Sequence, residues 1–171
     1  MLILTPPSEG KSSVNTVKKK FKETDFAFEP QVTTIIDKSK PDCILVHGDT
    51  TTCFAGALAA FYKQVPIAHV EAGLRTYHLS QPFPEEANRQ LVTRIANLHF
   101  APTKYSLQNL IAEGVNSKHI EITGNTIVDA LNMALDKMKN VGEYWPKELQ
   151  SVLITPDVPL LLVTGHRREN F

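Results

Sequence analysis

The sequence has few of the features that mark membrane, metal-binding or nucleic-acid-binding proteins. Only two cysteines, Cys43 and Cys53, occur in 171 residues. Both lie in apolar runs, which favours two buried reduced thiols over a zinc site or a disulfide framework. No apolar run approaches the roughly 20 residues that a membrane helix needs. Lys plus Arg and Asp plus Glu both number 18, so the balanced charge gives no support to a role on nucleic acid or on an anionic membrane. We therefore expect a cytoplasmic protein.

Several common site signatures are also missing. The chain has no Gly-x-Gly-x-x-Gly dinucleotide motif, no P-loop and no serine-nucleophile elbow. The spacing of the two cysteines does not match a zinc site. The residues themselves thus predict neither a metal nor one of the common phosphate-binding loops.

The composition and the hydrophobic pattern of the sequence change near residue 41. Residues 1–40 are polar and rich in lysine, and we interpret them as an atypical, solvated or loose segment. Beyond them, short apolar runs alternate with helical patterns, and strand–helix–strand units with short connections imply a parallel sheet. The predicted strands are 43–47, 66–70, 98–101, 119–123 and 159–164, and the predicted helices are 51–62, 85–97, 106–113, 125–139 and 145–153. The expected fold class is α/β, with a Rossmann-like parallel sheet flanked by helices.

Acidic residues follow the first two predicted strands of this sheet. Ligands of doubly wound sheets bind beyond the carboxyl ends of the strands, which makes Asp49 and Glu71 candidate site residues. A helix cap would by itself account for Asp49. An ion pair with Arg75 would account for Glu71, because an unpaired buried carboxylate is costly.

A third acidic position lies at the start of the next predicted helix. Glu85 and Glu86 follow a loop that Pro82 and Pro84 stiffen, and acidic side chains in a first helical turn favour the helix dipole. In the functional interpretation, the loop holds Glu85 near the two other carboxylates. Such carboxylates would perturb one another's protonation and supply general acid and base groups.

The last predicted strand is followed by the segment 165–170, which contains His166 and Arg167. These groups suit a diphosphate. Taken alone, the residues indicate a carboxylate-lined cleft in an α/β domain, for an anionic or sugar ligand.

Five motifs together resemble one known family. They are His47-Gly-Asp-Thr-Thr-Thr, His69-Val-Glu-Ala-Gly-Leu-Arg-Thr, Pro84-Glu-Glu-Ala-Asn-Arg, Ile122-Thr-Gly-Asn-Thr-Ile-Val-Asp-Ala and Val163-Thr-Gly-His-Arg-Arg-Glu-Asn. Their order and spacing are similar to those of the non-hydrolysing UDP-N-acetylglucosamine 2-epimerases. The resemblance covers roughly residues 30 to 171.

The resemblance implies an isomerase that interconverts UDP-N-acetylglucosamine and UDP-N-acetylmannosamine for bacterial surface polysaccharide. The implied chemistry removes the proton at sugar C2, expels UDP to leave a glycal, and adds UDP back after reprotonation from the other face. It implies a two-domain fold of the glycosyltransferase B type, no metal or redox cofactor, and a possible homodimer. The implied catalytic residues are Asp49, Glu71, Glu85 and His166, and the implied substrate-binding residues are His47, Arg75, Arg89 and Arg167.

The chain departs from the family's pattern at both ends. The family's early Gly-Thr-Arg-Pro-Glu loop is missing, and residues 4–11 are instead similar to the start of a peroxide-response protein family. The expected organisation is therefore an atypical segment 1–40, a Rossmann-like domain 41–151 and the start of a second, nucleotide-binding domain at 152–171. We expect little or no epimerisation by these residues alone. An inert pseudoenzyme and a nucleotide-sugar binding module are the alternatives.

Overall fold

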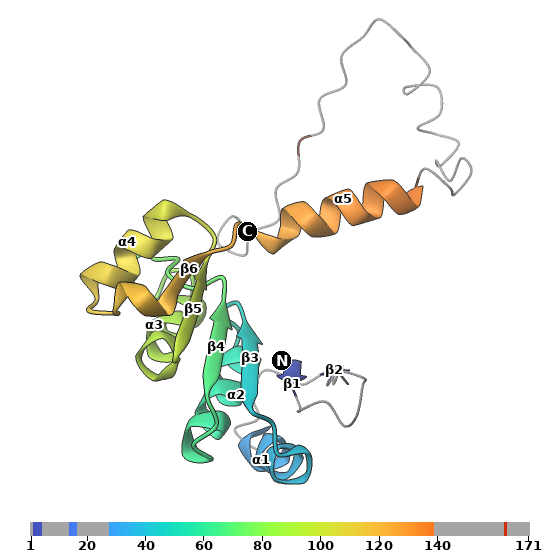
Figure 1. The fold of residues 1–171 in the computed structure, drawn as a ribbon. Helices are drawn as coiled ribbons and strands as arrows, with labels where there is room; N and C mark the ends of the chain where they lie inside the picture. Colours follow the sequence, from blue (N-terminus) through green and yellow to red (C-terminus); the bar gives the residue numbers. More distant parts are fainter. Residues whose placement is uncertain (1, 5–13, 17–27, 139–162, 164–171) are drawn as a thin grey trace, which may run out of the picture. The chain divides into compact units, whose positions relative to one another are not determined.

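The described part of the chain is built around one mixed sheet. The computed structural model describes residues 2–4, 14–16, 28–138 and 163 (Figure 1). The six strands of the sheet lie in the order β2-β1-β3-β4-β5-β6. They are β1 (Leu2–Leu4), β2 (Val14–Thr16), β3 (Cys43–His47), β4 (Ile67–Val70), β5 (Leu98–Ala101) and β6 (Ile120–Ile122).

The four strands from β3 to β6 pair in parallel. This confirms the predicted α/β class, and the four strands predicted between residues 43 and 123 lie within two residues of their observed bounds. The pairing of β1 with both β2 and β3 is antiparallel, and the sequence analysis did not foresee these two strands. The predicted strand 159–164, apart from Val163, and the predicted helix 145–153 lie outside the described residues.

Five α-helices and one short 3-10 helix occur in the described ranges. They are α1 (Phe28–Ser39), α2 (Thr51–Tyr62), α3 (Glu85–Ile95), α4 (Lys104–Ala112), η1 (Ser117–His119) and α5 (Thr126–Met138). The four helices predicted between residues 51 and 139 are confirmed to within two residues at each end. No described helix is long and apolar enough to cross a membrane.

Helix α1 corrects the interpretation of residues 1–40 as a loose segment. Val32 and Ile36 are only 1% and 3% exposed and belong to the main hydrophobic core. Their spacing of four residues places them on one face of a helix. The polar residues around them are that helix's solvent side, so the lysine-rich composition of the segment concealed a core element.

The main core lies between one face of the sheet and the helices α1, α2 and α3. Side chains alternate between the two faces of a strand, so Ile44, Val46 and Ile67 point into this core and are at most 1% exposed. A second, smaller cluster joins α4 to the sheet through Leu110, Ala101 and neighbouring residues. These two clusters fix the positions of the loops at the carboxyl ends of β3 and β4.

The chain divides into two compact units, residues 1–126 and 127–171. Most of α5 belongs to the second unit. Its apolar side chains, including Ile127, Leu131 and Leu135, are about half exposed or more. The proposed domain boundaries at 41, 151 and 152 remain predictions.

Candidate active site

The turn between β3 and α2 carries Asp49 at the carboxyl edge of the sheet. Gly48 has φ of +76°, a conformation that glycine adopts at little cost. The N-cap of α2 is Thr50, whose side chain accepts a hydrogen bond from the Cys53 amide at 3.2 Å. The cap is thus Thr50, which leaves the Asp49 carboxylate for another role.

Glu71 lies just after β4, across from the same turn. Its Oε2 is 3.3 Å from Nε2 of His47 and 3.6 Å from the point where a Cβ on Gly48 would lie. Glu71 itself has φ of +67°, which costs on the order of 1–3 kcal/mol for a residue other than glycine. Strain of this kind is typical of functional sites, and here it directs the carboxylate toward the β3–α2 turn.

The suggested ion pair between Glu71 and Arg75 does not form. Arg75 instead donates to both carboxylate oxygens of Glu113, at 2.6 and 2.8 Å, and to Thr93 Oγ1 at 2.7 Å. Its side chain is fully buried. This geometry favours a structural role for Arg75, in which it fixes the loop after β4 against α3 and the end of α4.

The two acidic residues in the first turn of α3 differ in their surroundings. Glu86 is completely buried and accepts hydrogen bonds from the amides of Thr76 and Tyr77, each at 3.0 Å, and from Gln90 at 2.7 Å. Burial raises the pKa of Glu86, but these hydrogen bonds and the charge of Arg89 outweigh it and lower the pKa overall. Glu86 therefore holds the 76–77 loop, and Glu85 remains the candidate for chemistry.

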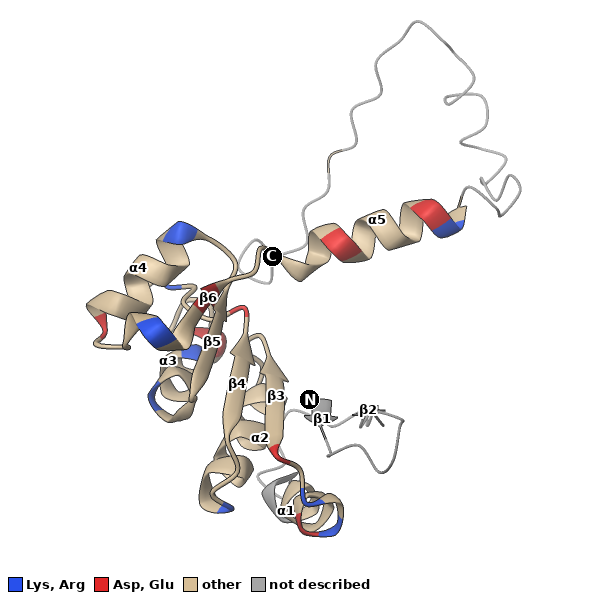
Figure 2. Cartoon of the chain, viewed as in Figure 1, with Lys and Arg blue, Asp and Glu red and all other residues tan. Residues whose placement is uncertain are grey.

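The charges of Glu71 and Glu85 both act on the carboxyl group of Asp49. The pKa of Asp49 is raised, first by burial and then by the negative charges of Glu85 and Glu71, while the positive charge of Arg89 opposes them. The Arg89 Nη1 atom is 3.7 Å from Asp49 Oδ2, and its side chain is 8% exposed. Figure 2 marks acidic positions after β4 and at the start of α3, where Glu71 and Glu85 lie. The expected convergence of Asp49, Glu71 and Glu85 matches this arrangement, although their catalytic role stays a prediction.

The remaining predicted site residues lie as follows. His47 ends β3 and its side chain is about half exposed beside Glu71. Arg89 is buried between Asp49 and Glu86, with its Nε 2.9 Å from Glu86 Oε2. His166 and Arg167 lie outside the described residues. Among the residues that the structure does describe, no three His, Cys, Asp or Glu side chains gather as metal ligands would.

The sequence analysis missed several residues that build the site. Asn88 donates to the Asp49 carbonyl at 2.9 Å, and His69 lies 2.8 Å from the Gly48 carbonyl. Helical spacing offered one signal, because Glu86, Arg89 and Gln90 are three and four residues apart and so share a face. No local pattern could show the contact of His69, because it joins strand β4 to the turn after β3, 21 residues earlier in the chain.

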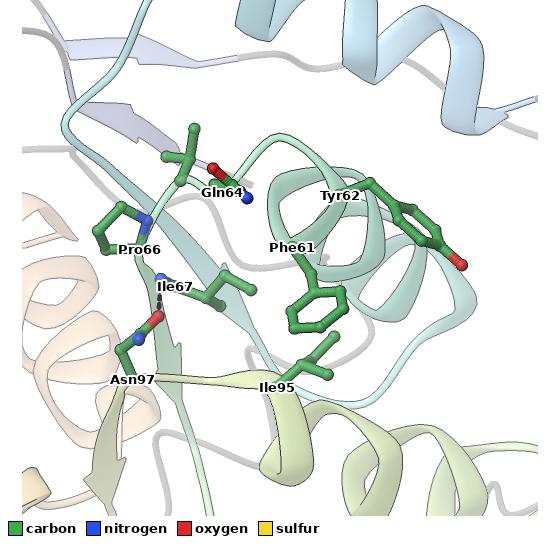
Figure 3. A pocket seen from close by; sticks show the side chains of 8 residues that line it. Phe61, Tyr62, Gln64, Pro66, Ile67, Ile95 and Asn97 are labelled. Carbon is green, nitrogen blue, oxygen red and sulfur yellow. Dashed lines mark hydrogen bonds between the residues drawn. The ribbon is translucent and has the colours of Figure 1, made fainter.

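A hollow of about 480 Å³ lies at the other end of β4. Figure 3 shows its lining of Phe61, Tyr62, Gln64, Pro66, Ile67, Ile95 and Asn97, in which the Asn97 side chain accepts from the Ile67 amide at 2.8 Å. These residues end α2 and α3 and begin β4. The hollow is therefore remote from the carboxyl edge of the sheet, where the three carboxylates lie.

Known proteins are similar to this chain in sequence and in fold. A family model described as UDP-N-acetylglucosamine 2-epimerase matches residues 27–171. The UDP-N-acetylglucosamine 2-epimerase of Campylobacter jejuni is 52% identical over 141 residues, which are 80% of this chain and 37% of that protein. The enzyme of the same name from Escherichia coli K12 is 51% identical over 139 residues, again 80% and 37% of the two chains. The chain thus spans a little over a third of the length of these relatives.

Solved structures agree with the sequence matches. The UDP-GlcNAc 2-epimerase of Neisseria meningitidis, solved with UDP-GlcNAc bound, has a TM-score of 0.66 at 47% identity and aligns with 73% of this chain and 35% of its own. A putative UDP-N-acetylglucosamine 2-epimerase from Listeria monocytogenes has a TM-score of 0.71 at 45% identity, with 84% and 37% covered. These neighbours have the glycosyltransferase B type of fold. The family model covers most of the chain, so the chain belongs to the UDP-N-acetylglucosamine 2-epimerase family.

Proposed function

We propose that this chain supplies the carboxylate-bearing half of an active site that interconverts UDP-N-acetylglucosamine and UDP-N-acetylmannosamine. The observation that carries the proposal is the placement of Asp49 and Glu71 at one turn, with Arg89 Nη1 3.7 Å from Asp49 Oδ2 and with the pKa of Asp49 raised by burial and by the charges of Glu85 and Glu71. This coupling lies at the carboxyl edge of a parallel sheet, where such folds bind ligands. The structures of the Neisseria meningitidis enzyme with UDP-GlcNAc and of the Staphylococcus aureus protein with UDP support the choice of ligand.

The proposed reaction needs groups that take a proton from C2 and return one from the opposite face. The raised pKa of Asp49 is nearer to neutral pH than that of an ordinary aspartate. A pKa near the working pH suits a group that must both take up and release a proton. Glu71 and Glu85 share the same edge of the sheet and complete the acid–base set. The assignment of base and acid among the three stays open.

The other proposed contacts follow from charge. His166 and Arg167 would stabilise the departing diphosphate. His47 is exposed enough to meet a substrate, and Arg89 would act through Asp49. The geometry of Arg75 favours support of the loop rather than direct contact. The proposal requires neither metal nor redox cofactor, and it includes a homodimer in the cytoplasm that supplies surface-polysaccharide precursors.

The function is tested by proton NMR of the nucleotide sugar. We expect the purified chain, incubated with UDP-N-acetylglucosamine, to form little or no mannosamine epimer. In a chimera, residues 28–171 replace the matching segment of the Neisseria meningitidis enzyme, with which this chain shares 48% identity over 139 residues. The chimera should form the epimer, and the same chimera with Asp49→Asn should not.

Two results would favour the alternatives. A chimera that is folded by circular dichroism and binds UDP-N-acetylglucosamine without turnover would indicate a nucleotide-sugar binding module. A folded chimera that neither binds nor turns over would indicate an inert protein. Appreciable turnover by the chain alone would contradict the expectation that further residues are needed.

A further inference from the structure

The turn that carries Asp49 is held by side chains from three different elements. The Gly48 carbonyl accepts a hydrogen bond from His69 Nε2 at 2.8 Å and one from Cys53 Sγ at 3.1 Å. The next carbonyl, that of Asp49, accepts from Asn88 Nδ2 at 2.9 Å. Strand β4 and helices α2 and α3 thus each contribute one donor to two consecutive peptide groups. The path of the backbone on both sides of the Asp49 Cα atom is fixed by these contacts.

The donor from His69 has a defined chemical form. A carbonyl oxygen can only accept, so the Nε2 atom of His69 must carry the hydrogen. The Nδ1 atom is then an acceptor, and it has no hydrogen-bond partner within the described ranges. The ring is completely buried, and burial lowers the pKa of His69 to about 4. At neutral pH His69 is therefore a neutral imidazole in a single tautomer.

The second donor to the Gly48 carbonyl is weaker. Burial raises the pKa of Cys53 to about 12, so its thiol keeps its proton, but a thiol is a poor hydrogen-bond donor. Without His69, the Gly48 carbonyl would depend on this thiol alone. The turn would then be free to shift away from Glu71, whose Oε2 lies 3.6 Å from the point where a Cβ on Gly48 would lie.

We infer that His69 is a positioning residue, which holds the Asp49 carboxylate in place against Glu71 through the Gly48 carbonyl. The inference rests on the proposed function, because a position matters to catalysis only if Asp49 takes part in it. The hydrogen bond itself, and its effect on Asp49, do not depend on turnover.

The structure provides a matched control in His99. This residue lies directly across from His69 in the β4–β5 register, is 2% exposed and likewise has an unpartnered Nδ1 atom within the described ranges. Its ring interacts with the backbone of Ala96 instead of Gly48. A substitution at either histidine thus removes a buried imidazole from the same face of the sheet, but only one of the two reaches the Asp49 turn.

The test is an NMR titration of this chain. Nitrogen-15 shifts of the wild-type ring should show a hydrogen on Nε2 of His69 and none on Nδ1 at pH 7. Carbon-13 shifts of the Asp49 carboxyl should give a pKa that falls toward the ordinary aspartate value in His69→Leu. The pKa should stay at the wild-type value in His99→Leu. It should also stay there in His69→Gln, whose amide can donate in place of Nε2.

Three outcomes would overturn the inference. One is a wild-type ring of His69 with its hydrogen on Nδ1 or with a positive charge at pH 7. Another is an Asp49 titration that responds equally to leucine at positions 69 and 99. The third is an Asp49 pKa in His69→Gln that differs from the wild-type value. If His69→Leu does not fold, the Asp49 pKa in His69→Gln and the tautomer of the wild-type ring still test the inference. An inactive enzyme with the expected titrations would refute the proposed function and leave the hydrogen bond to Gly48 intact.

Discussion

Burial decides the charge state of several single residues in this protein. The buried rings of His69 and His99 both have a pKa lowered to about 4, chiefly by burial. For the histidines, a lowered pKa favours the neutral form. Glu86 is equally buried, and burial alone would raise its pKa, but its hydrogen bonds outweigh burial and favour the charged form. Asp49 has fewer such bonds, and burial together with its acidic neighbours raises its pKa. Burial, hydrogen bonds and neighbouring charges thus shift the pKa values of these carboxyl groups in opposite directions.

The two histidines predict how stability depends on pH. Their pKa falls from 6.5 to about 4 on folding, so the unfolded state binds more protons between these values. The contribution of these histidines to the free energy of unfolding should be constant above pH 6.5. Between pH 6.5 and 4 the free energy of unfolding should fall with falling pH, by roughly 1.4 kcal/mol per histidine for each pH unit. The raised pKa of Asp49 acts in the opposite direction and reduces the observed slope. Urea unfolding at pH 7.0, 5.5 and 4.5 measures this dependence.

The double variant His69→Gln, His99→Gln is the control for that experiment. It should be less stable than the wild type at pH 7, but its unfolding free energy should change less between pH 7 and 4.5. An unchanged pH dependence in the double variant would show that other groups cause the acid sensitivity.

The places of the candidate site residues in the fold were predictable from the sequence, although their roles stay predictions. Asp49 and Glu71 were candidates because they follow strands, and Glu85 because it begins a helix. The side-chain partners around the site were not predictable, because Glu113 lies 38 residues from Arg75 and Asn88 lies 39 residues from Asp49. Side-chain pairing at such separations depends on how helices pack, which local patterns do not encode.

At the scale of elements, α4 is held to the loop after β4 by close backbone packing and by one ion pair. The Asn109 side chain donates to the Gly73 carbonyl at 2.9 Å, and the Arg75–Glu113 pair joins the same loop to the C-cap of α4. The loop that presents Glu71 therefore takes its position from α4. Changes in α4 should affect the site without touching it.

Gly73 tests the backbone contact. Its φ is +87°, and an added Cβ would lie 2.8 Å from the carbonyl carbon of Ser106. Gly73→Ala should cost at least about 3 kcal/mol, from backbone strain together with the clash. Gly114 has nearly the same φ, +88°, with nothing within 4 Å of its added Cβ, so Gly114→Ala should cost only about 1 kcal/mol. Equal losses in urea unfolding would contradict the proposed close packing.

Glu113 tests the ion pair. Glu113→Gln leaves the fully buried Arg75 guanidinium without its countercharge, and we expect a loss of about 3 kcal/mol in urea unfolding. The exposed pair between Lys63 and Asp37 is the comparison. Asp37→Asn should cost less than about 1 kcal/mol, because solvent screens such pairs. A similar cost for both would mean that burial does not govern the strength of these pairs.

The strands and α-helices from β3 to α5 were predictable, because short apolar runs mark the strands and helical spacing of apolar residues marks the helices. The 3-10 helix η1 was not predicted. The failure was α1, where Val32 and Ile36 are surrounded by polar residues and lysines. A core helix with a narrow apolar stripe resembles a solvated segment when composition is weighed above spacing. The antiparallel strands β1 and β2 have three residues each and precede the alternation of strands and helices from which β6, equally short, was predicted.

At the scale of the whole molecule, the chain is one part of the family's fold. It spans 37% of its relatives in Campylobacter jejuni and Escherichia coli, and the family match begins at residue 27, immediately before α1. The described portion contains the parallel sheet and the acidic edge, while the proposed diphosphate contacts His166 and Arg167 lie outside it. We therefore propose that the proton chemistry takes place at the described sheet edge.

The most direct test of that assignment is the exchange of the C2 proton of UDP-N-acetylglucosamine with solvent. The active chimera, incubated in deuterium oxide, should place deuterium at C2, as followed by proton NMR. Asp49→Asn, Glu71→Gln and Glu85→Gln should each slow this exchange by roughly 100-fold or more, with urea unfolding close to that of the parent. Exchange at the parent rate in all three variants would contradict the account.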